Sequence, residues 1–190
     1  MLADHYQQVV FFARGKRLAS IQDRGLTLRS AAYGEVTAFP EAASEDAAQL
    51  GIVDYLFLCV KNYTLEEVCT QIGPMISEDT VIIPLLNGID VSERVRRALD
   101  RGKVLDALVY VVTGTDEDFI VHHTSPYCRI HLGVTDPIRA AVPGVEPILS
   151  EVRDLLEGAG LQTVIENDIE AAIWRKYILN CAYNVVTAYY

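Results

Sequence analysis

Apolar runs alternate, over residues 1–102, with segments in which apolar residues recur every three or four positions. The apolar runs have the length of strands and lie at residues 7–14, 54–61 and 80–86. The segments with helical spacing lie at residues 15–25, 44–50, 64–76 and 89–102. Strands that are apolar on both faces suit a parallel sheet covered by helices. The pattern therefore predicts an α/β fold with a doubly wound sheet.

Two helix starts have specific sequence signals. Thr64 is followed three residues later by Glu67, which predicts a capping box. The dipeptide Asn87-Gly88 follows an apolar strand, and Asn-Gly is also the strongest short signal for a two-residue hairpin. The residues after it have helical spacing, with Asp90 as a cap. We therefore predict that Asn87-Gly88 joins a strand to a helix.

Residues 26–39 and the chain from Lys103 onward show a different pattern. Shorter alternating segments predict antiparallel strands, at residues 26–30, 35–39, 104–113, 118–124 and 127–133. The first two predict a hairpin, and the others should extend or edge the sheet. A helix at 146–160, a strand at 161–166 and a long helix at 168–190 follow. The proline-rich residues 135–147 are the best candidate for a mobile surface loop.

Composition and charge narrow the class of protein. The 190 residues are 51% hydrophobic and 22% charged, which is typical of a globular protein with a real core. The net charge of −10 argues against a nucleic-acid partner, because phosphates would meet the wrong sign. No apolar stretch approaches the roughly 20 residues that span a bilayer, and a signal-peptide pattern is missing. We therefore expect a cytoplasmic protein with no membrane partner.

The cysteines and histidines do not predict a metal site. Cys59, Cys69, Cys128 and Cys181 form no C-x-x-C pair and have no histidine at metal-ligand spacing. We expect buried thiols, no metal and no disulfide framework. His122 and His123 are neighbours in a strand-like run, so one should face the core and the other solvent.

The long final helix contains the most informative spacing. Lys176, Asn180 and Asn184 recur every four residues and share one helix face among apolar neighbours. A desolvated lysine loses proton affinity, and two amides beside it can orient a polar ligand. That combination suits protonation of a developing alkoxide. The alternative is an amphipathic helix whose polar stripe faces water.

Three further candidates follow predicted strands. Lys61 and Asn87 end neighbouring strands, where ligands bind in doubly wound sheets, although each residue could also serve a turn or reach solvent. Arg14 ends the strand at 7–14 and has no acid beside it in the sequence. An arginine at this position accommodates the 2′-phosphate of NADP, which favours NADP over NAD.

These pieces resemble the ketopantoate reductase family, the NADPH-dependent 2-dehydropantoate 2-reductases of pantothenate and coenzyme A synthesis. The matching segments are "VVFFARGKRLASIQDRGLTL", "DYLFLCVKNYTLEEV", "IIPLLNGIDVSERV", "DFIVHH" and "WRKYILNCAYNVVTAY". The resemblance implies reduction of ketopantoate to pantoate with NADPH as the cofactor. The alternatives are a related reductase of another 2-keto acid and a truncated, non-catalytic interaction module.

The resemblance also implies roles for individual residues. Lys176 would be the general acid, and Asn180 and Asn184 would bind substrate. Asn87 would lie between cofactor and substrate. Three further positions would contact NADPH, namely Arg14 at the 2′-phosphate, Lys61 in the cofactor site and Val112 through its backbone.

The resemblance further implies a domain division. Residues 1–167 would form a Rossmann-type dinucleotide-binding domain, and 168–190 would begin a helical substrate domain. The family's first strand and glycine-rich loop and most of its helical domain have no counterpart in the sequence, so we expect weak or no cofactor binding. Exposed strand edges and apolar surface should make the chain aggregation-prone or oligomeric, for example as a homodimer.

Overall fold

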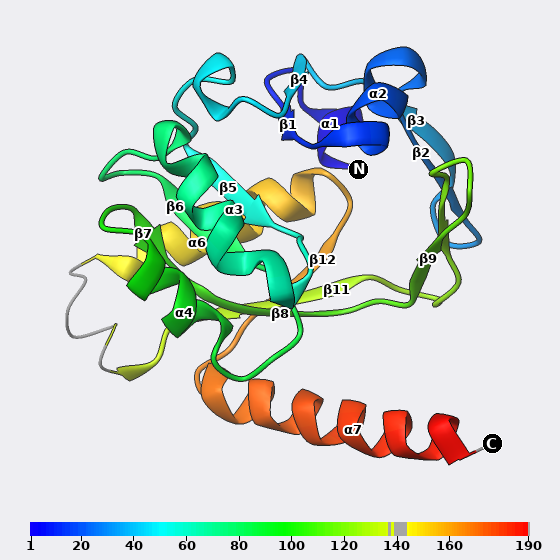
Figure 1. The fold of residues 1–190 in the computed structure, drawn as a ribbon. Helices are drawn as coiled ribbons and strands as arrows, with labels where there is room; N and C mark the ends of the chain where they lie inside the picture. Colours follow the sequence, from blue (N-terminus) through cyan, green and yellow to red (C-terminus); the bar gives the residue numbers. More distant parts are fainter. Residues whose placement is uncertain (137, 139–143, 190) are drawn as a thin grey trace.

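The core of the protein is a parallel sheet with helices on both faces (Figure 1). The computed structural model describes residues 1–136, 138 and 144–189. Strands β5 (Tyr55–Leu58), β6 (Val81–Pro84) and β7 (Lys103–Val104) pair in that order, all in parallel. Every residue of β6 is buried, which explains its uninterrupted apolar sequence.

Two apolar clusters lie on opposite faces of this sheet. On one face, Leu56 and Ile82 pack with helices α3 (Leu65–Ile72) and α4 (Val91–Ala98). On the other face, Ile83 packs with the buried side of α6 (Val145–Gly158). The predicted α/β fold with a covered sheet is confirmed.

Additional strands extend the fold beyond this sheet. Strand β11 (Arg129–Gly133) pairs antiparallel with β8 (Asp106–Tyr110) and parallel with β12 (Gln162–Ile165). A second sheet has the order β3, β2, β10, β9, with β3 at Gly34–Ala38, β2 at Leu26–Ser30, β10 at Val121–His123 and β9 at Thr113–Thr115. The predicted hairpin of β2 and β3 is confirmed.

The predicted antiparallel strands are confirmed in the pairs β2–β3, β9–β10 and β8–β11, and two further pairs of the added strands are parallel. Strands β10 and β2 pair in parallel, and so do β11 and β12. In the second case helix α6 connects the two strands, and such a crossover brings consecutive strands side by side in the same direction. Periodicity detects a strand, but it does not tell which distant strand becomes its neighbour.

Most predicted helices form within a few residues of their expected bounds. Helix α2 spans Gly15–Arg24, and α7 spans Ile169–Tyr189. The remaining short elements are α1 (Leu2–His5), β1 (Val10–Phe12), β4 (Ala42–Ser44) and the 3₁₀ turns η1 (Ala47–Gln49), η2 (Asn62–Thr64) and η3 (Gly73–Met75). Asn87-Gly88 joins β6 to α4, as predicted.

Four local helix predictions are wrong. The segment at 44–50 forms only η1, because Asp46 accepts a hydrogen bond from the Ala48 N–H in a local turn that competes with a helix. Thr64 makes no side-chain cap on α3, since its hydroxyl donates to the carbonyl of Lys61 instead. Asp90 precedes α4 but makes no side-chain cap hydrogen bond, and the helix ends at Ala98, before Gly102 is reached.

The cysteines and histidines occupy varied environments. Cys69 is buried, but Cys59 and Cys181 are exposed, so the prediction of buried thiols is wrong for these two. Cys59 directly follows the last residue of β5, and Cys181 lies on the exposed part of α7. His123 is buried and His122 is not, as predicted.

Three further predictions concern a surface loop, a metal site and a membrane span. Part of the loop predicted at 135–147 lies outside the described residues. Within the described residues, no group of three or more His, Cys, Asp or Glu side chains is placed to hold a metal ion. In the same part of the chain, every helix is too short or too polar to cross a bilayer.

Candidate functional site

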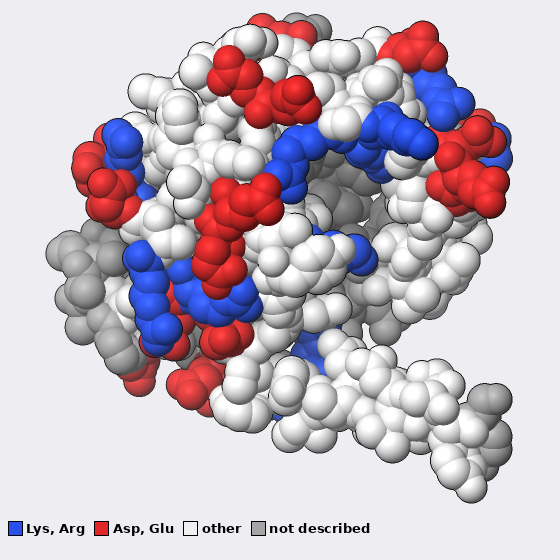
Figure 2. Space-filling view, in the orientation of Figure 1, with Lys and Arg blue, Asp and Glu red and all other residues white. Residues whose placement is uncertain are grey.

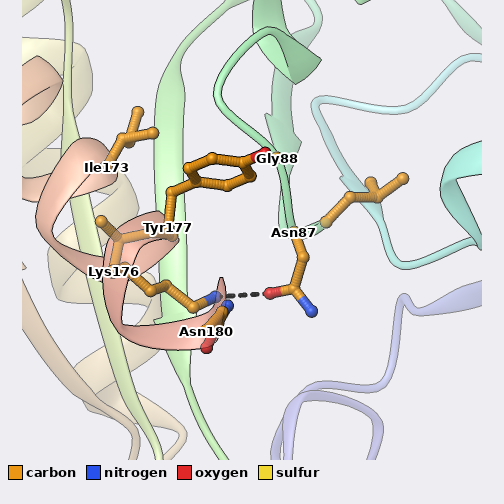
Figure 3. Close-up of a pocket in the computed structure, with 8 residues that line it drawn as sticks. Asn87, Gly88, Ile173, Lys176, Tyr177 and Asn180 are labelled. Atoms are coloured by element: carbon orange, nitrogen blue, oxygen red, sulfur yellow. Dashed lines mark hydrogen bonds between the residues drawn. The ribbon is translucent and has the colours of Figure 1, made fainter. Parts of the chain in front are cut away.

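Lys176 and Asn87 form the centre of the candidate site (Figure 3). The ammonium Nζ of Lys176 donates a hydrogen bond to Oδ1 of Asn87 over 2.7 Å. Lys176 lies on α7, and Asn87 lies in the loop after β6. Because this loop follows the carboxyl end of a parallel strand, the contact sits at the edge of the sheet where ligands bind in doubly wound folds.

Two glycines permit this arrangement. Gly88 has a φ of +137°, and a Cβ there would lie 2.9 Å from Cγ2 of Val91. At Gly133 on β11, a Cβ would lie only 2.6 Å from the Cβ of Ile169, the first residue of α7. Glycine at 133 therefore lets α7 approach the sheet closely. Ile169 and Ala172 complete this anchor by packing on Leu108.

The environment of Lys176 is largely apolar. The residue is only 8% exposed, and its Nζ lies 5.9 Å from the centre of the Tyr110 ring. Burial lowers the pKa of Lys176. Asn87 orients the ammonium through a neutral amide, so it adds no negative charge that would raise the pKa again. The site therefore presents a buried lysine that gives up its proton more readily than a solvated one.

A small open cavity adjoins this pair. It is lined by Leu86, Asn87, Gly88, Leu108, Ile173, Lys176, Tyr177 and Asn180. Asn180 lies one helical turn beyond Lys176, whereas Asn184 is exposed one turn further and does not line the cavity. The structure thus brings together Asn87, Lys176 and Asn180. Sequence reasoning did not select Tyr177, although its helical position beside Lys176 was available.

A polar brace holds the backbone of Asn87. The Nδ2 of Asn62 donates to the Asn87 carbonyl over 3.0 Å, and the guanidinium of Arg94 donates to the Asn62 carbonyl over 3.0 Å. Arg94 in turn pairs with Glu66 over 2.7 Å, and this contact lowers the pKa of Glu66. Asn62 and Arg94 were not found from the sequence, because their proximity depends on how α3 and α4 pack.

Of the four predicted cofactor residues, Asn87 lines the Lys176 cavity, whereas Arg14, Lys61 and Val112 do not. Lys61 is exposed just beyond β5, and its side chain makes no hydrogen bond or ion pair with the described residues. Val112 is exposed, but its N–H donates to Oγ of Ser125 and its carbonyl accepts from the N–H of Thr124. Its backbone groups already join the residues between β8 and β9 to the residues that follow β10.

Arg14 lies at the start of α2, as its place after β1 implies. Its guanidinium donates to Oε1 of Glu67 and, over 3.3 Å, to Oε1 of Gln71. The sequence places no acid next to Arg14, but the fold brings one from α3. The inference that Arg14 is free of acidic neighbours is therefore wrong. Glu67 is distant from Arg14 in the sequence, but the fold places the two side chains in contact.

Figure 2 shows a hollow in this face of the molecule. Among the described strands, β5 pairs only with β6 and β1 pairs only with β4, so each has one free edge. Lys and Arg side chains gather along the upper rim of the hollow. Their donors fit an anionic group such as a nucleotide phosphate.

Comparison with known proteins identifies relatives of this chain. Residues 1–137 match the family described as ketopantoate reductase PanE/ApbA. An uncharacterised oxidoreductase of Bacillus subtilis, YkpB, is 29% identical over 191 residues, covering 98% of this chain and 58% of that protein. The 2-dehydropantoate 2-reductase of Mesorhizobium japonicum is 26% identical over 196 residues, covering 93% of this chain and 57% of that protein.

A solved structure agrees with these matches. The 2-dehydropantoate 2-reductase of Porphyromonas gingivalis is 28% identical, with a TM-score of 0.80. The match covers 96% of this chain and 61% of that structure. The chain therefore shares its fold along nearly its whole length, and it spans a little over half the length of each of these relatives.

Proposed function

The chain belongs to the ketopantoate reductase family, and we propose from this premise that it carries the hydride-transfer site of an NADPH-dependent 2-dehydropantoate 2-reductase. The reaction would convert ketopantoate to pantoate in the cytoplasm, as a step of pantothenate and coenzyme A synthesis. The observation that carries the proposal is the contact between buried Lys176 and Asn87 at the carboxyl end of β6. A buried, partly desolvated ammonium beside a neutral amide is suited to protonating a ketone oxygen.

The proposed mechanism assigns a proton to Lys176. NADPH, when bound, supplies the hydride that reduces the ketone carbon. Lys176 holds a proton at Nζ and donates it to the ketone oxygen as negative charge develops there, which leaves a neutral amine. Since burial lowers the pKa of Lys176, the proton leaves more readily than from a solvated lysine. Asn87 fixes the direction of Nζ by accepting one of its hydrogen bonds.

The other proposed roles follow from position. Asn180 lines the same cavity and would bind the substrate, and Asn184 would contact a part of it that extends further along α7. Arg14, Lys61 and Val112 would contact the cofactor, and Asn87 would lie between cofactor and substrate. We also propose the division of the chain into a dinucleotide-binding domain at 1–167 and the start of a substrate domain at 168–190.

A substrate panel tests the proposed function. In a version extended to the full length of the relatives, NADPH oxidation is followed in the presence of ketopantoate or other branched and unbranched 2-keto acids, and the product is identified by mass spectrometry. We expect the highest kcat/KM with ketopantoate and pantoate as the product. A higher value with another 2-keto acid would assign a related reductase. Absence of NADPH oxidation with every acid would overturn the proposal of an enzyme.

A further inference from the structure

Arg14, just before α2, and Glu67, on α3, form an ion pair. Arg14 is the N-cap of α2, which follows β1, and Glu67 lies in the first turn of α3, which follows β5. Gln71 supports the pair, because its Oε1 lies 3.3 Å from Nη1 of Arg14 and its Nε2 donates to Oε1 of Glu67 over 3.3 Å. The Glu67 carboxylate therefore accepts the hydrogen bond that Nη1 of Arg14 could otherwise donate to a ligand.

The pair is accessible and can be broken at modest cost. The Arg14 side chain is 40% exposed and the Glu67 side chain is 55% exposed. Ion pairs between exposed side chains contribute little net stabilisation, since water and salt screen them. A ligand that binds the Arg14 guanidinium more strongly than Glu67 does can therefore displace the Glu67 carboxylate.

NADP and NAD, the two cofactors that Arg14 could contact, differ only in the 2′-phosphate of the adenosine ribose. In dinucleotide-binding sheets, an arginine at this position accommodates the 2′-phosphate of NADP, while an acid there accepts a hydrogen bond from the free 2′-hydroxyl of NAD. This structure places both an arginine and an acid at the position. A phosphate has to displace the carboxylate and is repelled by it, whereas a hydroxyl can donate to it without displacement.

We propose that Glu67 is a specificity-determining residue for the cofactor. Glu67 weakens the binding of nucleotides that have a 2′-phosphate relative to those with a free 2′-hydroxyl, by competing for Arg14 and by repelling the phosphate. The inference rests on the proposed function, since it assumes that Arg14 faces the adenosine ribose. It refines the NADPH assignment, because the preference for NADPH becomes a balance between Arg14 and Glu67.

The test compares two variants that each remove one negative charge from an exposed ion pair. Glu67→Gln keeps the shape of the side chain and an oxygen that can accept from Arg14, but it removes the charge. Glu35→Gln is the matched control, because Glu35 is 61% exposed and pairs with Arg29 on the β2–β3 hairpin. The probes are adenosine 2′,5′-bisphosphate and adenosine 5′-phosphate, which differ only in the 2′-phosphate. Dissociation constants are measured by NMR titration, which detects weak binding.

We expect Glu67→Gln to tighten binding of the bisphosphate by about fivefold to tenfold and to change binding of the monophosphate by less than about twofold. Glu35→Gln should change neither. An unchanged ratio of the two constants in Glu67→Gln, weaker bisphosphate binding, or no detectable binding of either probe would overturn the inference.

A third variant separates this outcome from failure of the proposed cofactor site. Arg14→Gln should abolish the preference for the bisphosphate. If Arg14→Gln lowers that preference while Glu67→Gln has no effect, the cofactor site stands and only the role of Glu67 is refuted. If Arg14→Gln has no effect on either probe, the assignment of Arg14 to the cofactor fails and the role of Glu67 fails with it.

Discussion

Lys176 donates a 2.7 Å hydrogen bond to Asn87 across a sequence separation of 89 residues. The contact joins the start of the long helix α7 to the loop after the central strand β6. Lys176 is buried by this arrangement, and its only polar partner among the described residues is an amide. The physical consequence is a lysine that is oriented without a compensating charge.

The first prediction concerns the titration of Lys176. Burial lowers its pKa, so the measured value should lie below about 10.4, the value of a solvated lysine. Reductive ¹³C-methylation and NMR titration can measure it directly. Asn87→Ala should lower the pKa further, because the amide oxygen stabilises the charged form. Arg175→Lys, at an exposed neighbouring position on α7, provides a reference lysine that should titrate normally.

The same shift predicts a change of stability with pH. The unfolded chain binds more protons at Lys176 than the folded chain between the lowered folded pKa and about 10.4, so this residue adds stability as pH rises through that window. Lys176→Met should flatten the rise in the free energy of unfolding across this window. An equally steep rise in Lys176→Met would contradict the assignment.

The second prediction concerns the brace on Asn87. Asn62→Ala removes the donor to the Asn87 carbonyl, so the loop should lose its fixed orientation and turnover should fall by roughly tenfold. The pKa of Lys176 should shift as well, which a purely structural role of Asn62 would not cause. Gln22→Ala is the matched control, because Gln22 also donates from its side-chain amide to a backbone carbonyl, that of Ala43, over 2.9 Å. Equal effects of the two variants would refute the brace.

Particular residues show how far the sequence allows prediction. Local sequence periodicity predicts that Asn87 joins a strand to a helix. It also predicts that Lys176 and Asn180 share one helix face, because each pattern extends over only a few neighbouring residues. The brace from Asn62 and the approach of Glu67 to Arg14 do not follow from it, because they depend on the packing of helices that are far apart in the sequence. Cys59 was expected to be buried because its neighbours are apolar, yet it follows a strand at an open sheet edge.

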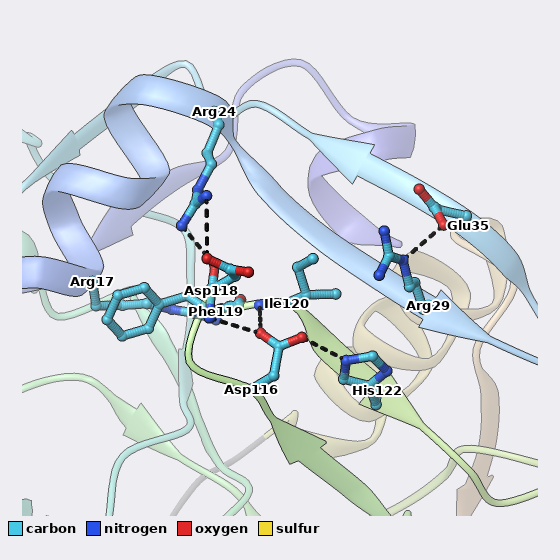
Figure 4. Close-up of polar contacts among 9 residues, drawn as sticks. All are labelled: Arg17, Arg24, Arg29, Glu35, Asp116, Asp118, Phe119, Ile120 and His122. Atoms are coloured by element: carbon cyan, nitrogen blue, oxygen red, sulfur yellow. Dashed lines mark hydrogen bonds and ion pairs between the residues drawn. The ribbon is translucent and has the colours of Figure 1, made fainter.

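The third prediction concerns the turn between β9 and β10, which packs on α2 (Figure 4). Phe119 has a φ of +63°, and its carbonyl accepts a hydrogen bond from Arg17 over 2.5 Å. The carboxylate of Asp116 accepts from the N–H groups of Asp118 and Ile120 and pairs with His122 over 2.8 Å. These contacts hold the turn in a conformation that Phe119 would not otherwise adopt.

The hydrogen bond from His122 is the largest cause of the lowered pKa of Asp116. A carboxyl whose folded pKa is lowered stabilises the fold above its unfolded pKa of about 3.9, and this contribution is lost as pH falls through the folded pKa. The protection factor of the Ile120 amide against hydrogen exchange should therefore fall in acid. Asp116→Asn should show the lowered protection factor already near neutral pH. Identical Ile120 protection in the variant and the parent would contradict this.

The fourth prediction concerns the exposed apolar surface of α7. Ile178, Tyr183 and Val185 are 64%, 63% and 72% exposed, and such surfaces favour association. We expect sedimentation velocity to detect oligomers or aggregates. Replacing Ile178 and Tyr183 by glutamate should increase the monomer fraction, whereas a clean monomer for the parent chain would refute the expectation.

The central claim is that Lys176 supplies the proton in the reduction. In a version extended to the full length of the relatives, Lys176→Ala should lower kcat with ketopantoate by about a hundredfold to ten-thousandfold, the usual contribution of a general acid, while NADPH affinity changes by less than about threefold. Arg175→Ala, at the exposed neighbouring position, should leave both values unchanged. Steady-state kinetics and NADPH titration of the two variants measure this most directly. Unchanged turnover in Lys176→Ala, or an equal loss in Arg175→Ala, would contradict the assignment of Lys176 as the acid.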